Sequence, residues 1–149
     1  MVKKLIKRKI TLAIAESCTG GYVSNMITNV SGASNIFDRG IVCYSNLSKV
    51  ELLNVDPISI EKYGAVSESI AQQLAFNIRI LSNTNIGIST TGIAGPTGGT
   101  PEKPVGLVYI GFSSENETLV TKHQLSAERI IFKEKVFEII ISYLEKLVK

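Results

Sequence analysis

The sequence predicts an α/β fold, specifically a three-layer α/β/α sandwich with a mixed, mostly parallel sheet. Short apolar runs of strand length alternate along the chain with segments whose apolar residues recur at helical spacing. The run Val105–Phe112 is apolar at both alternating sets of positions, as expected for a central strand covered on both faces. A more polar run, Thr118–Leu125, follows the turn Ser114–Glu117, so the last two strands are expected to form an antiparallel hairpin.

The first predicted strand and helix lie before Gly32. Ile10–Ala15 is an apolar run of strand length that leads into a turn with two glycines. Beyond this turn, apolar residues at helical spacing predict a helix that Gly32 ends: Val23, Met26, Ile27 and Val30. The next run, Asp38–Tyr44, predicts the second strand. The Lys-rich residues 1–9 are expected to form a solvated helical face.

Three helices are predicted between the second and third strands. Asn46 is the expected cap of a short first helix. Asp56 and Pro57 start a further helical turn, with proline at the first helical position, and this turn stops at Gly64. Ser67 can cap the clearest helix of the chain, whose apolar face is made of Ile70, Leu74, Ile78 and Leu81.

Composition restricts the class of protein. Of the 149 residues, 44% are hydrophobic and 19% are charged, which suits a single domain over residues 1–149 with a packed core and excludes a disordered chain. The net charge of +3 suits an anionic small molecule and nucleic acid alike. The charged start does not fit a signal peptide, and no apolar run approaches the roughly 20 residues of a membrane span. A soluble cytoplasmic protein is therefore expected.

The counts of single residue types restrict the chemistry further. His123 is the one histidine, on a polar strand where it is expected to be exposed, and Asp38 and Asp56 are the two aspartates. A Ser-His-Asp triad therefore has few candidates, and a His-rich metal site has none. Cys18 and Cys43 form no CxxC motif, so neither a disulfide framework nor a zinc ribbon is indicated. The sequence also contains neither a Walker A motif nor GxGxxG.

Two glycine-bearing turns are candidate walls of one site. Ser17–Gly21 follows the first predicted strand, and Gly92–Gly99 follows a third predicted strand, Ile86–Thr91. Ligands of open α/β sheets bind beyond the carboxyl ends of the strands. Gly20 and Gly21 let the backbone approach a ligand and open a helix whose N–H groups favour an anion, although a generic strand-to-helix turn is the commoner reason for such a pair.

Ser17 is the candidate nucleophile, because a serine at a strand-to-helix turn can lie beside N–H donors that form an oxyanion hole. An N-cap serine is the alternative, and Cys18 is a second candidate nucleophile whose commoner role is a small buried residue. With histidine scarce, the serine needs a lysine as its base. Lys49 is the best placed, with a solvated helix lysine as the alternative, and Glu16 and Tyr44 are the next candidates for the base.

The last helix is expected to run from Ser126 nearly to Lys149, with Arg129 in its first turn. The helix macrodipole disfavours a cation at this end by about a few tenths of a kcal/mol or more. The position of Arg129 is better explained if an anion, such as a phosphate, shares the same end. The alternative is an exposed arginine whose charged group lies in water.

The segment Ala15–Gly21 resembles the signature of the CinA C-terminal domain, also called PncC, a family of nicotinamide-nucleotide amidases. The resemblance continues in ordered blocks over nearly the whole chain: Ser31–Ser34, Phe37, Gly40, Tyr44–Asn46, Lys49, Gly64–Ser67, Thr91–Pro96, Gly98–Gly99 and Lys103–Gly106. Two features depart from the family pattern. The helix before the first strand is shortened, and Ser126–Arg129 differs from the Gly-Asp/Glu-Arg often found there.

The resemblance implies hydrolysis of the carboxamide of nicotinamide mononucleotide to nicotinic acid mononucleotide and ammonia, with no cofactor and no metal. The implied catalytic residues are Ser17, Lys49 and Tyr44. Substrate contacts are expected from Thr19, Gly20, Gly21, Thr91, Gly92, Ala94, Gly95 and Arg129. The expected partner is this small nucleotide, rather than nucleic acid or a membrane, and the oligomeric state, including a homo-oligomer, stays open. The competing function is a domain that binds a nucleotide, or a competence- or damage-associated partner, without turnover.

Overall fold

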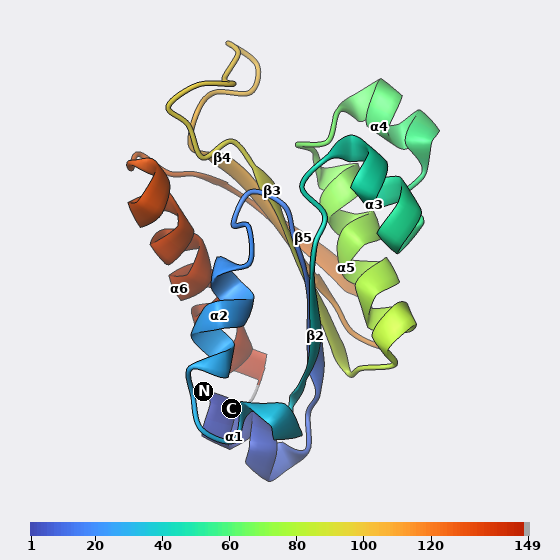
Figure 1. Cartoon of the computed structure of the whole chain (residues 1–149), viewed down its shortest axis with the longest axis vertical. Helices are drawn as coiled ribbons and strands as arrows, with labels where there is room; N and C mark the ends of the chain where they lie inside the picture. The colour runs from blue at the N-terminus through green and yellow to red at the C-terminus, as the bar shows by residue number, and fades with distance from the viewer. Residues whose placement is uncertain (148–149) are drawn as a thin grey trace.

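The computed structural model describes residues 1–147, which form one five-stranded sheet with helices on both faces (Figure 1). The strand order is β2-β1-β3-β4-β5. The central strand pairs are parallel where β1 meets β2 and β3, and antiparallel where β4 meets β3 and β5. The strands are β1 (Leu12–Glu16), β2 (Phe37–Val42), β3 (Ile86–Gly92), β4 (Leu107–Ser113) and β5 (Thr118–Gln124). The predicted three-layer α/β/α sandwich with a mixed, mostly parallel sheet is thereby confirmed.

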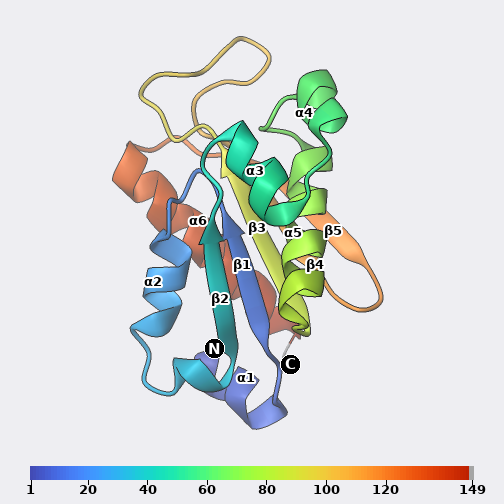
Figure 2. The same ribbon diagram turned by 45° about the vertical axis from the view of Figure 1, so that its right-hand side comes forward.

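The helices form two layers, one on each face of the sheet. In Figures 1 and 2, α2 and α6 cover one face, and α3, α4 and α5 lie on the other, while α1 lies at the end of the sheet where β1 begins. The helices are α1 (Val2–Arg8), α2 (Tyr22–Thr28), α3 (Asn46–Leu53), α4 (Pro57–Tyr63), α5 (Glu68–Ser82) and α6 (Arg129–Leu147), with a short 3-10 turn, η1, at Ala33–Asn35. No helix among residues 1–147 is long and apolar enough to cross a membrane.

Side-chain caps determine where three helices begin. The Ser67 hydroxyl accepts from the amide of Ile70 at the start of α5, and the Asp56 carboxylate accepts from the amides of Ile58 and Ser59 at the start of α4. These two caps are as predicted. The cap of α3 is Ser45 rather than Asn46, because it is the Ser45 hydroxyl that accepts from the amide of Ser48.

Three predicted helix features differ from the structure. Helix α2 ends at Thr28, so Gly32 caps η1 instead of ending α2, and α6 begins at Arg129 rather than Ser126. In α5 the predicted face included Leu81, which is 50% exposed. The buried stripe of α5 follows a step of four residues, through Ile70, Leu74 and Ile78, and the next position on it is Ser82. The predicted end near Lys149 lies outside the described residues.

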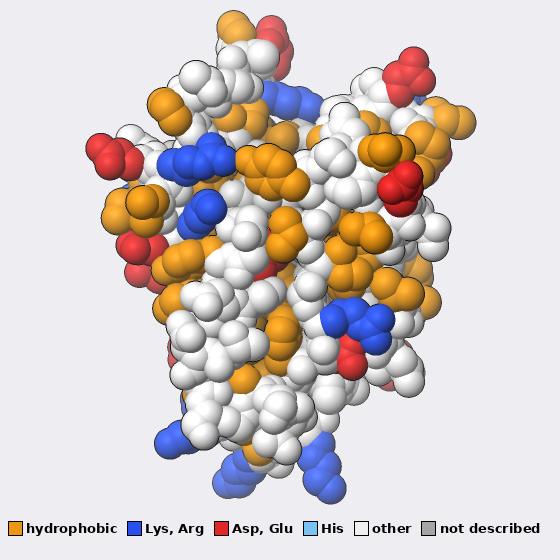
Figure 3. Space-filling model, viewed as in Figure 1, with side chains coloured by type: hydrophobic (Ala, Val, Ile, Leu, Met, Phe, Trp, Pro, Cys, Tyr) orange, Lys and Arg blue, Asp and Glu red, His pale blue; other side chains and the backbone are white. Residues whose placement is uncertain are grey.

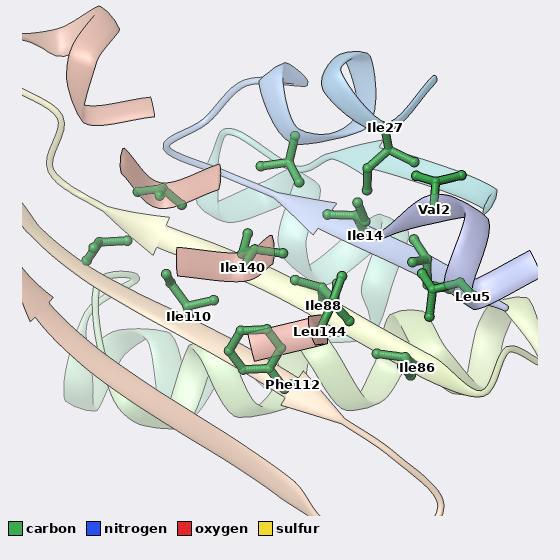
Figure 4. Close-up of a cluster of buried hydrophobic side chains, with 14 of the residues drawn as sticks. Val2, Leu5, Ile14, Ile27, Ile86, Ile88, Ile110, Phe112, Ile140 and Leu144 are labelled. Carbon is green, nitrogen blue, oxygen red and sulfur yellow. The ribbon is translucent and has the colours of Figure 1, made fainter. Parts of the chain in front are cut away.

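Alternation along β1 divides the core between the two faces. Leu12 and Ile14 belong to the cluster against α1, α2 and α6, whereas Ala13 and Ala15 belong to the cluster against α3 and α5. Figure 4 shows the first cluster, in which sheet residues such as Ile14, Ile88 and Ile110 lie beside residues of α6, Ile140 and Leu144. The same alternation continues beyond the strand and determines which helix each following side chain faces.

Helix α5 packs very close to the sheet. A Cβ atom on Gly87 of β3 would lie 2.1 Å from the carbonyl oxygen of Ala75, and one on Gly111 of β4 would lie 2.6 Å from that of Ala71. Glycines at these two positions therefore allow the α5 backbone to approach the sheet. These two glycines therefore set the short distance between α5 and the sheet.

The carboxyl ends of β1, β2 and β3 lie at one edge of the sheet. Strand β1 connects through α2 to β2 on one side, and its other neighbour, β3, is reached from β2 through α3, α4 and α5 on the opposite face. The connections therefore leave in opposite directions around the end of β1. In open α/β sheets this arrangement opens a crevice that binds ligands.

Candidate active site

Ser17 and Lys49 meet at the end of β1. Ser17 follows Ala13 and Ala15 at alternate positions, so it faces the α3 side of the sheet, and Lys49 lies on α3. Nζ of Lys49 lies 3.0 Å from Oγ of Ser17. Ser17 is 8% exposed and Lys49 is 1% exposed. The alternative of a solvated helix lysine is therefore wrong for Lys49.

Backbone carbonyls hold the amino group of Lys49 against Ser17. Nζ donates to the carbonyl oxygens of Cys43 at 2.8 Å, Tyr44 at 3.2 Å and Ser45 at 3.5 Å. No salt bridge joins Lys49 to a carboxylate in the part of the chain that the structure describes. Burial lowers the pKa of Lys49, because the charged form loses its hydration. The arrangement favours the neutral amine that can accept a proton.

Cys18 and Cys43 lie close to the same lysine, and both are buried thiols. Burial raises the pKa of Cys18 to about 12 and also raises that of Cys43. Both groups are therefore neutral thiols near pH 7 and add no charge that would hold the proton on Lys49. A thiol with a raised pKa is a poor nucleophile, so this environment disfavours Cys18 in that role.

A cavity of about 340 Å³ opens above Ser17 and Lys49. It is lined by Ser17, Cys18, Tyr44, Lys49, Ala65, Val66, Thr91, Gly92, Ile93, Ala94, Gly95, Thr97, Gly98 and Arg129. The loop after β3 forms one wall, and the segment before α5 forms another. The Thr91 hydroxyl joins these two walls, because it donates to the carbonyl oxygen of Ala65 at 2.8 Å.

Arg129 and Tyr44 lie together at the rim of this cavity. One nitrogen of Arg129, Nη2, donates to the Tyr44 hydroxyl at 2.8 Å, and Nη1 donates to the carbonyl oxygen of Gly95 at 2.7 Å. Arg129 thus connects the first turn of α6 with the loop after β3 and with the residue that follows β2. The sequence offered a phosphate or bulk water as the partner of this cation, whereas the structure gives it two protein acceptors.

Of the residues after Ser17, Cys18 lines the cavity and the next three do not. Thr19 is fully buried, and Thr19, Gly20 and Gly21 are not among the cavity-lining residues. The N-terminus of α2 is already occupied by the Glu16 carboxylate, which accepts from the amides of Gly21, Val23 and Ser24. The anion expected at this helix end is thus supplied by the protein itself. Sequence reasoning missed this role, although a glutamate between a strand and a helix start is a signal for it.

Two backbone amides beside Ser17 remain without an acceptor. The amide of Ser17 donates to Thr90, that of Gly20 to Ser17, and that of Tyr22 to Thr19. Among the hydrogen bonds between different residues of the described chain, none has the amide of Cys18 or Thr19 as its donor, and the contact of the Cys18 amide is with the thiol of its own residue. Both residues are buried, and buried amides without a partner are rare in native proteins. These two donors are suited to an oxyanion.

A larger and more apolar groove of about 880 Å³ adjoins the cavity and shares Ala94 and Arg129 with it. The groove contains neither Ser17 nor Lys49, both of which line the smaller cavity. In the space-filling view (Figure 3), Lys and Arg side chains lie over the upper part of α6, near the edge where β1 ends. The rim therefore has a basic side.

His123, the remaining titratable candidate, lies outside the cavity. His123 is on β5, where its ring nitrogen Nε2 lies 2.9 Å from the Thr121 hydroxyl, and it is partly buried rather than exposed as expected. Burial lowers the pKa of His123, and the residue does not line the cavity. Within residues 1–147, no group of three or more His, Cys, Asp or Glu side chains is placed to hold a metal ion.

Comparison with known proteins gives one consistent family. The model described as the CinA C-terminal domain matches residues 1–148. A protein from Thermoanaerobacter sp. (strain X514), named for competence-damage induction, is 56% identical over 129 residues, which are 87% of this chain and 31% of that protein. A CinA-like protein from Kosmotoga olearia is 51% identical over 129 residues, again 87% of this chain and 31% of the relative. The chain thus spans about a third of the length of these curated relatives.

Solved structures give the same result. The competence/damage inducible protein CihA from Agrobacterium tumefaciens has a TM-score of 0.95 at 32% identity, covering 99% of this chain and 91% of that chain. The competence damage-inducible protein A (ComA) from Klebsiella pneumoniae has a TM-score of 0.93 at 27% identity, covering 97% of this chain and 89% of that chain. The layers and the sheet described above are therefore those of known structures.

Proposed function

The chain belongs to the CinA C-terminal domain family, and from this premise we propose that it is an amidase that acts on nicotinamide mononucleotide. It hydrolyses the carboxamide of this nucleotide to a carboxylate and releases ammonia. The observation that carries the proposal is the buried pair of Ser17 and Lys49, with Nζ 3.0 Å from Oγ and no carboxylate beside the lysine in the described chain. This is the geometry of a nucleophile and its base.

The reaction begins when Oγ of Ser17 attacks the amide carbonyl carbon. Neutral Lys49 accepts the hydroxyl proton, and the lowered pKa of Lys49 favours this neutral form. The new C–O bond pushes the carbonyl electron pair onto oxygen. The amides of Cys18 and Thr19 are the donors available to this oxyanion, and fixed donors of this kind contribute about 10²–10³-fold in rate.

The second half of the reaction returns the enzyme to its starting state. The tetrahedral intermediate collapses, the C–N bond breaks, and the Lys49 ammonium gives its proton to the departing nitrogen, which leaves as ammonia. The neutral lysine then takes a proton from a water molecule that attacks the acyl-enzyme. Collapse of this second intermediate releases the carboxylate and returns the proton to Ser17.

The rest of the cavity supports the choice of a mononucleotide. Arg129 has five N–H donors, and two of them donate to Gly95 and Tyr44, so that the guanidinium is held at the rim. The other donors can bind a phosphate. We assign the ribose to the wall from Thr91 to Gly95, which lines the same cavity. The cavity volume of about 340 Å³ is at the small end of the range for ligand pockets, about 300–1,000 Å³.

The proposal is tested by measuring ammonia release from nicotinamide mononucleotide by the purified chain, in buffer with EDTA, beside the Ser17→Ala variant. We expect sustained release by the wild type and almost none by the variant. Binding of the nucleotide by the wild type without ammonia release would favour the competing function, a binding domain without turnover. Release that requires added metal would contradict the mechanism.

A further inference from the structure

The mechanism above does not use Glu16, although this residue is the most heavily hydrogen-bonded side chain near the nucleophile. Glu16 is the last residue of β1 and is fully buried. Alternation along the strand places its side chain on the α2 face, opposite to Ser17. Its carboxylate accepts from the hydroxyls of Thr19 and Ser24, both at 2.6 Å, in addition to the three amides of the α2 N-terminus.

With this many donors, the carboxylate is not free to act as a base. A carboxylate offers about four lone-pair sites, and Glu16 receives five donors. All of them come from residues 19–24. Glu16 therefore fixes the segment that follows the nucleophile, and it fixes it from behind.

The network extends from Glu16 to strand β3. The Thr19 hydroxyl lies 2.6 Å from Glu16 and 2.8 Å from the hydroxyl of Thr90. An ionised carboxylate can only accept, so Thr19 donates to Glu16 and Thr90 must donate to Thr19. The loop is thus tied to β1 through Glu16 and to β3 through Thr90, and both of its attachments are buried.

This network determines which amides stay free. The donors at Gly21, Val23 and Ser24 are used by Glu16, and the neighbouring amides are used by backbone carbonyls. The two that remain are those of Cys18 and Thr19, next to Ser17. One of these two amides belongs to Thr19, whose hydroxyl is hydrogen-bonded to both Glu16 and Thr90.

We propose that Glu16, acting through Thr19 and Thr90, is a positioning residue that holds the Cys18 and Thr19 amides in the geometry of an oxyanion site. The inference rests on the proposed amidase function. A purely structural Glu16 would stabilise the fold with no particular effect on the chemical step. The two roles therefore differ in kinetics, not in whether a variant is less stable.

The test uses two changes that disturb the network at opposite ends. Glu16→Gln places an amide NH₂ against N–H or O–H donors, and Thr90→Val removes the one hydroxyl that donates to Thr19. Thr90→Ser restores this hydroxyl. Ser89→Ala is the matched control, because it also removes a buried hydroxyl of β3, but one that donates to Ala71 on the opposite face.

We expect kcat for ammonia release to fall about 10-fold or more in Glu16→Gln and in Thr90→Val, with KM within about twofold of the wild type. The fall of kcat/KM at low pH, which protonation of Lys49 would produce in the proposed mechanism, should occur at the same pH as in the wild type, since Lys49 is untouched. Thr90→Ser recovers most of kcat, and Ser89→Ala lowers Tm without lowering kcat. A wild-type kcat in both network variants, or an equal loss in Ser89→Ala, would overturn the proposal.

A second readout separates this inference from the proposed substrate. A fluorophosphonate probe phosphonylates a reactive serine, with formation of the Oγ–P bond and loss of fluoride, and donors that stabilise the phosphonyl oxygen speed this step. Intact-protein mass spectrometry follows the label on Ser17. If the wild type is labelled but releases no ammonia from the nucleotide, the proposed function fails, and the labelling rates of the variants still test the role of Glu16 and Thr90. Slower labelling of Thr90→Val than of Ser89→Ala supports the positioning role. Equal labelling of these two variants, or no labelling of the wild type, contradicts that role.

Discussion

At the scale of single residues, the site depends on a lysine placed where a charge is costly. Nζ of Lys49 lies among three backbone carbonyls and the Ser17 hydroxyl, in a side chain that is 1% exposed. The carbonyls accept hydrogen bonds from either form of the amine, but burial penalises the ammonium. Position and desolvation together favour the neutral amine that the proposed mechanism requires.

Replacement of this base should abolish turnover without loss of the fold. Lys49→Met keeps the length of the buried side chain and removes the proton acceptor, so we expect kcat for ammonia release to fall by about 10²–10⁴-fold or more. Lys49→Arg should be equally inactive. Because the larger guanidinium has to fit a closed site, Lys49→Met is the better test of a variant that keeps the fold. The double variant with Ser17→Ala should lose little more than either single variant, since the two act as one unit. Near-normal kcat in Lys49→Met would exclude lysine as the base.

Arg129 offers a separate prediction about binding. Arg129→Ala removes the guanidinium that we assign to the phosphate, so KM for the mononucleotide should rise about 10-fold or more. Because Arg129 also holds Gly95 and Tyr44, the variant Tyr44→Phe serves as the control for the loss of that contact alone. Steady-state kinetics with nicotinamide riboside, which lacks the phosphate, should barely distinguish Arg129→Ala from Tyr44→Phe. An equal loss with both substrates would make Arg129 a structural or catalytic residue.

At the scale of elements, the site is made where three strands end and where loops of fixed shape begin. The loop after β3 packs closely against the segment that returns to β4, because a Cβ on Gly95 would lie 2.3 Å from Cγ1 of Val105. Gly95 also has a positive φ of 77° and accepts from Arg129 through its carbonyl. The wall of the cavity therefore depends on the absence of a side chain at one position.

A pair of glycine variants isolates this steric effect. Gly95→Ala and Gly98→Ala both place alanine at positive φ, but the new Cβ at Gly98 meets nothing closer than 3.8 Å. We expect Gly95→Ala to displace the loop and to lower kcat/KM about 10-fold or more, whereas Gly98→Ala costs only the backbone strain, about 1 kcal/mol of unfolding free energy. Kinetics and thermal unfolding of both variants check this. Equal effects would show that the contact with Val105 is unimportant.

Local patterns predicted most elements, because apolar spacing, capping residues and turns are properties of neighbouring residues. The strand over Ile86–Thr91 and the helix that Ser67 caps are examples. The errors lie at helix starts: α6 begins at Arg129 rather than at the predicted Ser126, and the N-cap of α3 is Ser45 rather than Asn46. Short apolar runs predict that an element exists more firmly than where it begins.

At the scale of the whole molecule, the site joins residues that are far apart in the sequence. Lys49 is 32 positions from Ser17, and Arg129 is 85 positions from Tyr44, with which it shares a hydrogen bond. Local spacing contains no information on such contacts, so the residues were proposed from chemistry and resemblance, and only the packing of both helical layers brings them together. The role of Glu16 at the N-terminus of α2 is different, because a glutamate between a strand and a helix start is a local signal for it.

The buried lysine also predicts how global stability depends on pH. Its folded-state pKa is lowered from the unfolded value of about 10.4, so the unfolded chain binds more protons between these two values, and this residue makes stability rise with pH there. Below the window the penalty is fully present. Lys49→Met should therefore be more stable than the wild type at pH 7, with the difference shrinking as pH approaches 10. Urea unfolding at several pH values measures it, and a less stable variant at pH 7 would contradict the assignment.

The most direct test of the account compares two neighbouring residues. Ser17→Ala and Cys18→Ala each remove one candidate nucleophile from the same loop, and ammonia release from nicotinamide mononucleotide is measured for both beside the wild type. We predict that Ser17→Ala loses at least about 10²–10⁴-fold in kcat, while Cys18→Ala, which removes a neutral buried thiol, stays within about 10-fold. Release by Ser17→Ala at the wild-type rate, or its loss in Cys18→Ala alone, would contradict the Ser17–Lys49 mechanism.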